Sequence, residues 1–246
     1  MVICFAAFTL LTGVTTFEVG LMSPPQSPPP RHTLSIVNAP SDFIRNYIDS
    51  TTDVSEALAT AREDAQEFGL HVPDSITGQL LTTLAGVSRA HGAIAVTPTA
   101  SVVGLHLLAG LGEKGILTCI DPEPEHQKRA KKAFHDAGYG SSRIRFLPSR
   151  PLDVMGRLAR GQYQVIFGEV APLDLRAFID ASLPLLASGG VLVLPDALLD
   201  GTVADSTRKD RETVTAREAD EYVRSLDEVV VCRLPLGGGT TLITKL

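Results

Sequence analysis

The sequence predicts an α/β fold: a doubly wound, mostly parallel sheet of seven strands that ends in an antiparallel hairpin. From residue 93 onward, short apolar runs alternate with helix-length amphipathic segments. This is the pattern of βαβ units with helices on both faces of a sheet. The last two runs are separated only by residues 235–239. That connection is too short for a crossover helix, so these two strands are expected to pair as an antiparallel hairpin.

The elements are expected in the following order. Residues 40–92 have helical spacing and form a helical lead-in, with Asp53 and Asp74 placed as N-caps. The expected strands are 93–96, 115–120, 144–147, 163–167, 191–194, 229–234 and 240–244. The expected helices between them are 101–112, 124–137, 152–160, 173–187 and 203–226. The last helix carries both charge signs at i, i+3 and i+4 spacing, which favours a solvated face over a lid beside the pocket.

Residues 1–39 have a different character from the rest. Residues 1–22 are apolar with a single charge, Glu18, and a proline-rich run follows. A basic n-region and a small-residue cleavage site are both missing, so a signal peptide or membrane anchor is less favoured than a disordered or over-extended tail. Translation would then start at Met1 or at Met22, and no stable membrane span is expected.

Composition excludes several classes of protein. The chain has 246 residues, 44% of them hydrophobic, and a net charge of −6. Such a chain buries one large core and has no basic surface for nucleic acid. Three cysteines, Cys4, Cys119 and Cys232, have no metal-ligand spacing and cannot pair completely. We therefore expect a cytoplasmic protein without structural zinc.

The residues that follow the strands are the candidate ligand contacts, because open α/β sheets bind ligands at that edge. Asp121 ends the second strand, roughly 20 residues after the end of the first, where an acid accepts hydrogen bonds from ribose hydroxyls. Capping of the next helix is the alternative role for Asp121. The turn after the first strand, residues 97–104, has one glycine, Gly104. The phosphate-binding turn of NAD or ATP sites is thus missing, and a nucleoside cofactor without phosphates is favoured.

Three stretches carry a family resemblance: residues 120–123 (IDPE), 189–196 (GGVLVLPD) and 234–242 (LPLGGGTTL). They resemble the class I S-adenosylmethionine-dependent methyltransferases with a Rossmann-like fold, and within them the bacterial O-methyltransferases similar to catechol and caffeoyl-CoA O-methyltransferases. The resemblance covers about residues 52–246. It implies S-adenosylmethionine as cofactor, a hydroxyl of a small molecule, aromatic molecules included, as methyl acceptor, and a homodimer.

The resemblance also implies roles for particular residues. It places the cofactor against Thr97, Pro98, Ser101, Val103, Asp121, Pro151 and Glu169, with the ribose on Asp121 and the adenine near residues 149–151. The family's acid in the first strand is replaced by Ala95, and two of its glycines by Thr97 and Ser101.

The metal site of the family is altered in the same way. Its ligand positions read Glu169, Asp196 and Ala197. Because the amide ligand is lost at Ala197, the sequence favours no metal over a two-carboxylate Mg²⁺ site, for which Glu169 and Asp196 are the only candidates. These two are then the candidate catalytic residues, as general bases, and His106 and His126 are alternatives. The altered motifs leave a second hypothesis open: a catalytically impaired binding or dimerisation module.

Overall fold

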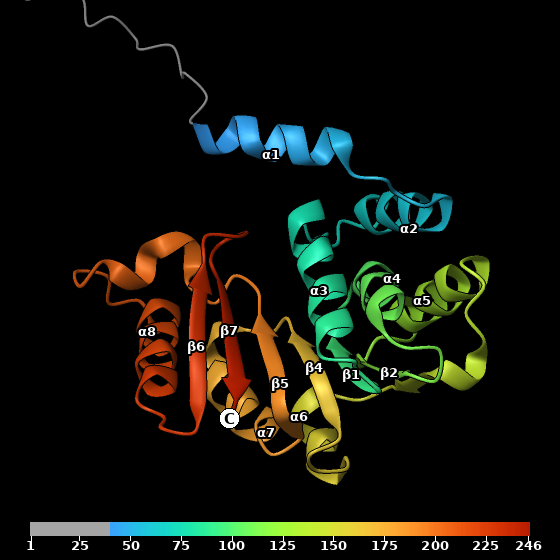
Figure 1. The fold of residues 1–246 in the computed structure, drawn as a ribbon. Coiled ribbons are helices and arrows are strands. Elements are labelled where there is room, and N and C mark those ends of the chain that lie inside the picture. Colours follow the sequence, from blue (N-terminus) through green and yellow to red (C-terminus); the bar gives the residue numbers. More distant parts are fainter. Residues whose placement is uncertain (1–39) are drawn as a thin grey trace, which may run out of the picture. The chain divides into compact units, whose positions relative to one another are not determined.

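The computed structural model describes residues 40–246, which form a seven-stranded sheet with helices on both faces (Figure 1). The predictions for the tail, residues 1–39, lie outside the described residues. The strands are β1 Gly92–Val96, β2 Ile116–Ile120, β3 Ile144–Leu147, β4 Tyr163–Gly168, β5 Leu186–Leu194, β6 Val229–Leu234 and β7 Thr240–Lys245. Their order in the sheet is β3-β2-β1-β4-β5-β7-β6. Neighbours among β1 to β5 are parallel, whereas β7 is antiparallel to both β5 and β6, as predicted.

Eight α-helices accompany the sheet in the described part of the chain. They are α1 Pro40–Thr51, α2 Glu56–Glu67, α3 Ser75–Val87, α4 Ala100–Gly110, α5 Pro124–Asp136, α6 Pro151–Val154, α7 Leu175–Ser182 and α8 Arg211–Arg224. Four short 3₁₀ helices are η1 Ser141–Arg143, η2 Met155–Arg157, η3 Pro172–Asp174 and η4 Leu199–Ala204. In Figure 1, α3, α4 and α5 lie on one side of the sheet, and α6, α7 and α8 lie on the other. The helical lead-in predicted over residues 40–92 therefore consists of α1, α2 and α3.

The central strand β1 shows how the sequence supports two cores. All five of its residues are buried, as expected for a parallel strand that is covered on both faces. Ala93 and Ala95 join the hydrophobic cluster that includes α4 and α5. Ile94 and Val96 join the cluster on the opposite face, with α7 and α8. Because side chains alternate along a strand, one apolar run packs against both layers of helices.

Several predicted boundaries are wrong. The N-cap of α2 is Ser55, whose side chain accepts from the Leu58 amide, and not Asp53. The N-cap of α3 is Asp74, as predicted. The helix predicted over 152–160 is the shorter pair α6 and η2. The helix predicted over 173–187 ends at Ser182, because β5 is longer than the apolar run that marked it.

The charged segment predicted as one helix over 203–226 is also divided. It contains the end of η4 and, after a non-helical stretch, α8. The side chain of Asp210 accepts a hydrogen bond from the Thr213 amide and starts α8. A strong N-cap inside the segment thus decides where the helix begins.

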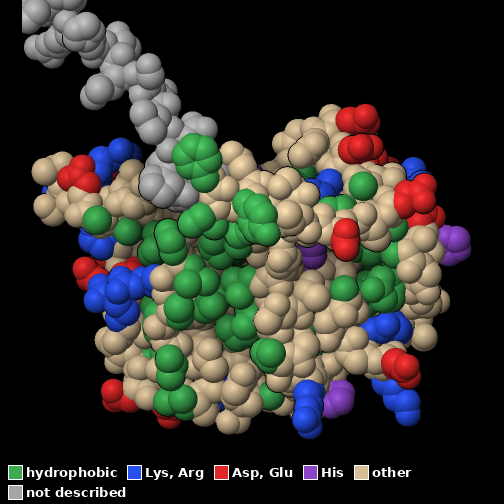
Figure 2. All heavy atoms as spheres, turned by 45° about the horizontal axis from the view of Figure 1, so that its top comes forward, with side chains coloured by type: hydrophobic (Ala, Val, Ile, Leu, Met, Phe, Trp, Pro, Cys, Tyr) green, Lys and Arg blue, Asp and Glu red, His purple; other side chains and the backbone are tan. Residues whose placement is uncertain are grey.

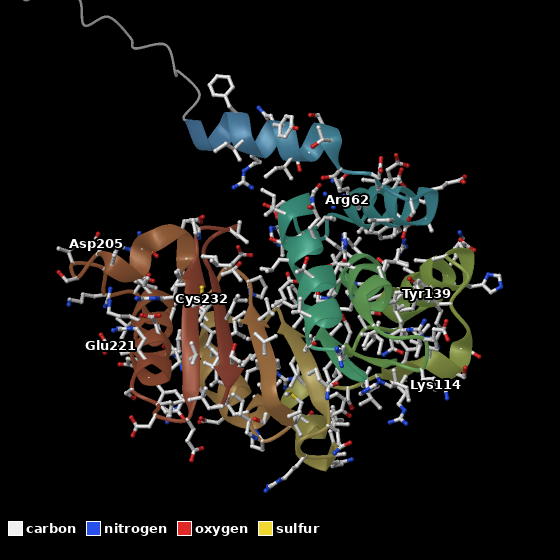
Figure 3. All side chains as sticks on the ribbon, in the orientation of Figure 1. Arg62, Lys114, Tyr139, Asp205, Glu221 and Cys232 are labelled. Carbon is white, nitrogen blue, oxygen red and sulfur yellow. The ribbon has the colours of Figure 1, made fainter. Side chains whose placement is uncertain are left out.

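The surface over the β6 end of the sheet is hydrophobic. In Figure 2, hydrophobic side chains gather on the side of the molecule where Figure 1 shows β6 and β7, whereas charged side chains lie around this patch. Val230 on β6 is 54% exposed, and Cys232 on the same strand is also exposed (Figure 3). Among residues 40–246, no helix is both long enough and apolar enough to cross a membrane.

Candidate functional site

The candidate site lies where the strand order reverses, between β1 and β4. Both β2 and β4 pair with β1, so the connections after β1 and β4 leave in opposite directions. Ligands of doubly wound sheets bind in the crevice at such a point. Thr97 follows β1, Asp121 follows β2, Glu169 follows β4, and Asp196 stands two residues after β5. Four of the predicted site residues therefore share this edge of the sheet.

Asp121 is buried and held by its own turn. Its Oδ1 accepts a 2.6 Å hydrogen bond from the Glu123 amide, and its Oδ2 lies 3.0 Å from His126 Nδ1. Glu123, and not Asp121, is the N-cap of α5. A carboxylate has about four acceptor positions, so two local contacts leave capacity for ribose hydroxyls. The structure places His126 at this carboxylate rather than beside Glu169.

Thr97 and Glu169 join the ends of β1 and β4. The Thr97 hydroxyl donates a 2.6 Å hydrogen bond to Glu169 Oε2. In turn, Thr97 Oγ1 accepts from the Thr99 amide at 3.0 Å and lies 2.9 Å from Thr99 Oγ1. Burial raises the pKa of Glu169 above its ordinary value, although the Thr97 hydrogen bond and the nearby His71 oppose this effect. Thr97 therefore has a role that glycine could not have: it orients a partly buried carboxylate.

The other predicted cofactor contacts differ in how exposed they are and in how near they lie to this edge of the sheet. Ser101, near the start of α4, lines a cavity of about 660 Å³ between α2 and α5, a volume that suits a small-molecule ligand. Pro98 and Pro151 are half-buried, in the turn after β1 and at the start of α6. Val103 is fully buried, and its amide donates to the Thr99 carbonyl. The structure does not bring the Val103 side chain to the surface of the site.

Asp196 has a strained backbone and a fixed side chain. Its φ of 52° lies in the left-handed region, which costs energy for a residue with a Cβ. Its Oδ1 accepts a short hydrogen bond from the Gly238 amide in the β6–β7 turn. It therefore holds the terminal hairpin and does not cap the segment toward Leu198. Strained residues held in this way are common at functional sites.

His71 completes this part of the site, and sequence reasoning missed it. It lies in the connection between α2 and α3, and its Nδ1 is 3.9 Å from Glu169 Oε1 and 3.8 Å from Asp196 Oδ2. The three residues line a cavity of about 240 Å³ together with Val72, Pro73 and Phe167. A lone histidine between two helices carries no sequence motif, so only the fold identifies it.

The donor set does not fit the divalent cation that the resemblance implies. Ala197 offers a methyl group where the third ligand would stand. Glu169 Oε2 and Asp196 Oδ1 already accept hydrogen bonds from Thr97 and Gly238. In the part of the chain from residue 40 to 246, no three His, Cys, Asp or Glu side chains are grouped so that they could hold a metal. A site that lacks the amide ligand and offers only two carboxylates makes a poor Mg²⁺ site.

His106, the other histidine considered from the sequence, lies away from this edge. It packs on α4 against α3, where Thr82 donates a 2.9 Å hydrogen bond to its backbone carbonyl. Its Nε2 is buried without a hydrogen-bond partner among the described residues. Burial lowers the pKa of His106 to about 4, with a further contribution from Arg62. This residue is part of the packing between helices.

Comparisons with known proteins give one consistent family. A family model described as O-methyltransferase matches residues 55–246. A protein of Mycolicibacterium vanbaalenii, provisionally named an O-methyltransferase, is 37% identical over 199 residues, which is 81% of this chain and 88% of that protein. A relative from Mycobacterium marinum with the same provisional name is 35% identical over 203 residues, 82% of this chain and 91% of its own.

Solved structures share the fold of this chain. A crystal structure of a Corynebacterium glutamicum protein is 59% identical, with a TM-score of 0.81, covering 83% of this chain and 96% of that one. TomG from Streptomyces achromogenes, an O-methyltransferase of tomaymycin synthesis solved in complex with S-adenosylmethionine, is 23% identical. Its TM-score is 0.74, over 82% of this chain and 96% of that one. At that identity the likeness supports the fold alone.

Proposed function

Because this chain belongs to the O-methyltransferase family, we propose that the edge of the sheet at Asp121, Glu169 and Asp196 is its active site. The protein is an S-adenosylmethionine-dependent O-methyltransferase of small molecules. The observation that carries the assignment of the site is the position of these three carboxylates at the ends of β2, β4 and β5, around the reversal of strand order.

The cofactor site is proposed to centre on Asp121. Its buried carboxylate would accept hydrogen bonds from the two ribose hydroxyls, with Pro151 near the adenine. Thr97, Pro98, Ser101 and Glu169 would border the methionine end of the cofactor. The hydrogen bond that joins Thr97 and Glu169 at this edge supports this assignment, and the buried side chain of Val103 restricts its contribution to the backbone. When bound, S-adenosylmethionine supplies an electrophilic methyl group on a sulfonium.

The acceptor is proposed to occupy the cavity beside Glu169 and Asp196. At about 240 Å³ this cavity is small, so the acceptor is a small molecule. Val72, Pro73 and Phe167 provide apolar walls, and the two carboxylates provide polar contacts at one end. Positioning of the hydroxyl and exclusion of water are the main contributions that methyl transfer requires of a protein.

Calorimetric titration with S-adenosylhomocysteine tests the cofactor site. We expect Asp121→Ala to weaken binding at least about tenfold, because hydrogen bonds to a charged group are worth about 1.5–3 kcal/mol each. Asp174→Ala is the matched control, since that aspartate is exposed in η3. Heat from neither S-adenosylmethionine nor S-adenosylhomocysteine at millimolar concentration would refute the proposed site.

Methyl transfer to catechol and caffeate, followed by mass spectrometry of the products, tests the acceptor site. We expect Glu169→Gln and Asp196→Asn to lose turnover while they still bind S-adenosylhomocysteine. Cofactor binding without turnover on any phenol in the wild type would instead favour an impaired binding module.

We propose that the protein forms a homodimer through the hydrophobic patch at β6 and β7. Exposed Val230 on the terminal strand of the sheet supports this assignment, because contiguous apolar surface marks interaction sites. Light scattering coupled to gel filtration is expected to give twice the chain mass. Val230→Asp is expected to give a monomer, and a monomeric wild type at micromolar concentration would contradict the proposal.

We further propose a cytoplasmic location. Cys119 and Cys232 are both free thiols, which suits a reducing compartment. Burial raises the pKa of the Cys119 thiol far above its ordinary value and keeps it unreactive. Fractionation of the native cells is expected to recover the protein with cytoplasmic markers, and recovery from the medium would contradict this proposal.

A further inference from the structure

The proposed acceptor site contains an imidazole that faces both carboxylates. His71 Nδ1 lies 3.9 Å from Glu169 Oε1 and 3.8 Å from Asp196 Oδ2. Both distances are too long for a direct hydrogen bond. An oxygen atom about 2.7 Å from Nδ1 and from either carboxylate oxygen would fit such a separation. The spacing therefore suits a hydroxyl that is shared between the imidazole and a carboxylate.

Each carboxylate is fixed through one oxygen and presents the other to His71. Glu169 uses Oε2 to accept from Thr97 and turns Oε1 toward the imidazole. Asp196 uses Oδ1 to accept from Gly238 and turns Oδ2 toward the imidazole. Side chains held by hydrogen bonds to their neighbours lose little freedom when a ligand binds, so this arrangement is preorganised.

The chain around His71 determines where its side chain points. Leu70 and Val72 pack against the hydrophobic core, and Pro73 is buried. Gly69, with a φ of 68°, makes the turn that ends α2. His71 is the exposed residue between two inward ones, with 65% of its side chain accessible. A ligand can therefore reach the imidazole.

The charged side chains that line the cavity around His71 belong to four residues. Arg45 on α1 pairs with Asp74 at the start of α3, so these two lining residues balance each other. Burial alone would raise the pKa of Asp74, but hydrogen bonds from Thr77 and Arg45 hold it below its ordinary value. The other two are Glu169 and Asp196, whose carboxylates face the imidazole.

We propose that His71 is a catalytic residue that accepts the proton of a phenolic methyl acceptor, without a divalent cation. This role rests on the proposed function. The acceptor oxygen forms a bond to the methyl carbon, the methyl–sulfur bond breaks, and its electron pair goes to sulfur. The hydroxyl proton moves to His71 Nδ1, and solvent later removes it. S-adenosylmethionine is the methyl donor, so the step needs no other reactant.

Turnover without metal is the first measurement. With S-adenosylmethionine, catechol and EDTA, we expect His71→Ala to lower kcat by about 10²-fold or more, the usual contribution of general-base catalysis. The KM for catechol and the Kd for S-adenosylhomocysteine are expected to change less than about twofold. Added imidazole is expected to restore part of the activity of His71→Ala. His135→Ala is the matched control, because His135 is exposed on α5 far from these contacts.

Binding of 4-nitrophenol is the second measurement, and it needs no turnover. The phenolate absorbs at a longer wavelength than the phenol, so the spectrum reports the position of the proton. In the presence of S-adenosylhomocysteine, we expect the wild type to bind the phenolate at a pH where free 4-nitrophenol is mostly neutral. His71→Ala is expected to bind it as the neutral phenol.

The outcomes separate this role from the proposed function. Wild-type kcat and pH profile in His71→Ala would overturn the role of His71 and leave the methyltransferase assignment intact. A phenolate spectrum that depends on His71, without methyl transfer to any acceptor, would overturn the function and support the proton transfer. A neutral-phenol spectrum in the wild type overturns the role of His71. A requirement for Mg²⁺ in the wild type also overturns it.

Discussion

The Thr97 hydroxyl at the end of β1 donates a 2.6 Å hydrogen bond to Glu169 Oε2 at the end of β4. This bond opposes the effect of burial, which raises the pKa of Glu169. Thr97→Val removes the donor at nearly constant shape, so the pKa of Glu169 is expected to rise further. Carbon NMR titration of the Glu169 carboxyl group measures this rise.

Thr83→Val, at an exposed position on α3, serves as control and is expected to leave the titration of Glu169 unchanged. An unaltered pKa of Glu169 in Thr97→Val would show that the Thr97 hydrogen bond does not stabilise the ionised carboxylate.

Gly78 on α3 is expected to tolerate no side chain. A Cβ at this position would overlap the imidazole ring of His106. Gly78→Ala should lower the free energy of unfolding by about 1–3 kcal/mol, measured by urea denaturation. The double variant Gly78→Ala with His106→Ala should recover most of this loss, because the ring is gone.

Gly86, on the same helix, provides the control for Gly78. A Cβ there meets nothing within 4 Å, so Gly86→Ala is expected to stabilise the protein by about 0.5–1 kcal/mol. Equal effects of the two glycine substitutions would contradict the packing of α3 against α4.

The buried ring of His106 is expected to make the folded protein less stable in acid. Its pKa in the folded protein is about 4, because the ring is buried and because Arg62 lies between α2 and α3 (Figure 3). The unfolded chain binds a proton near pH 6.5, so stability falls as the pH decreases from about 6.5 to about 4. The loss should reach roughly 3 kcal/mol. His106→Gln should reduce this dependence in urea unfolding at pH 7 and pH 4.5, and an unchanged difference would refute it.

Asp196 combines a structural contact with its proposed chemical role. Asp196→Ala leaves the Gly238 amide without its acceptor and is expected to cost about 1–3 kcal/mol in the free energy of unfolding. Asp196→Asn keeps an acceptor oxygen and tolerates the left-handed backbone, so its stability should be close to that of the wild type. Turnover should fall in both variants. Asp200→Asn is the control, because Asp200 is exposed in η4. Loss of activity in this control would show that the loop as a whole, and not Asp196 in particular, is required for turnover.

Much of the fold could be predicted from the sequence because its signals are local. The alternation of apolar runs and amphipathic segments predicted all seven strands, and the short 235–239 connection predicted the antiparallel hairpin. The ends of helices were less predictable. Helical spacing of apolar residues continues through the segments 173–187 and 203–226, each of which was predicted as one helix. In the structure, β5 already starts at Leu186, and the Asp210 N-cap starts α8 inside the second segment.

The candidate site could be predicted only in part, for a similar reason. Asp121, Glu169 and Asp196 follow strands, so their common edge is a consequence of parallel topology. The internal contacts of the site come from residues far apart in the chain. Thr97 and Glu169, which form a hydrogen bond, are 72 positions apart in the sequence, and Asp196 and Gly238 are 42 positions apart. Such pairs depend on strand register and on turns, which no spacing rule encodes.

The sequence by itself determined the class of sheet and predicted the edge at which a ligand would bind, and the resemblance implied the loss of two glycines and of an amide ligand. Only the tertiary structure decided what replaces those lost groups. Thr97 stands where a glycine would be and orients Glu169. His71, from a connection between two helices, reaches the carboxylates that follow β4 and β5. The physical reason is that hydrophobic periodicity specifies which residues are buried, whereas chemistry depends on distances between atoms of residues that are remote in sequence.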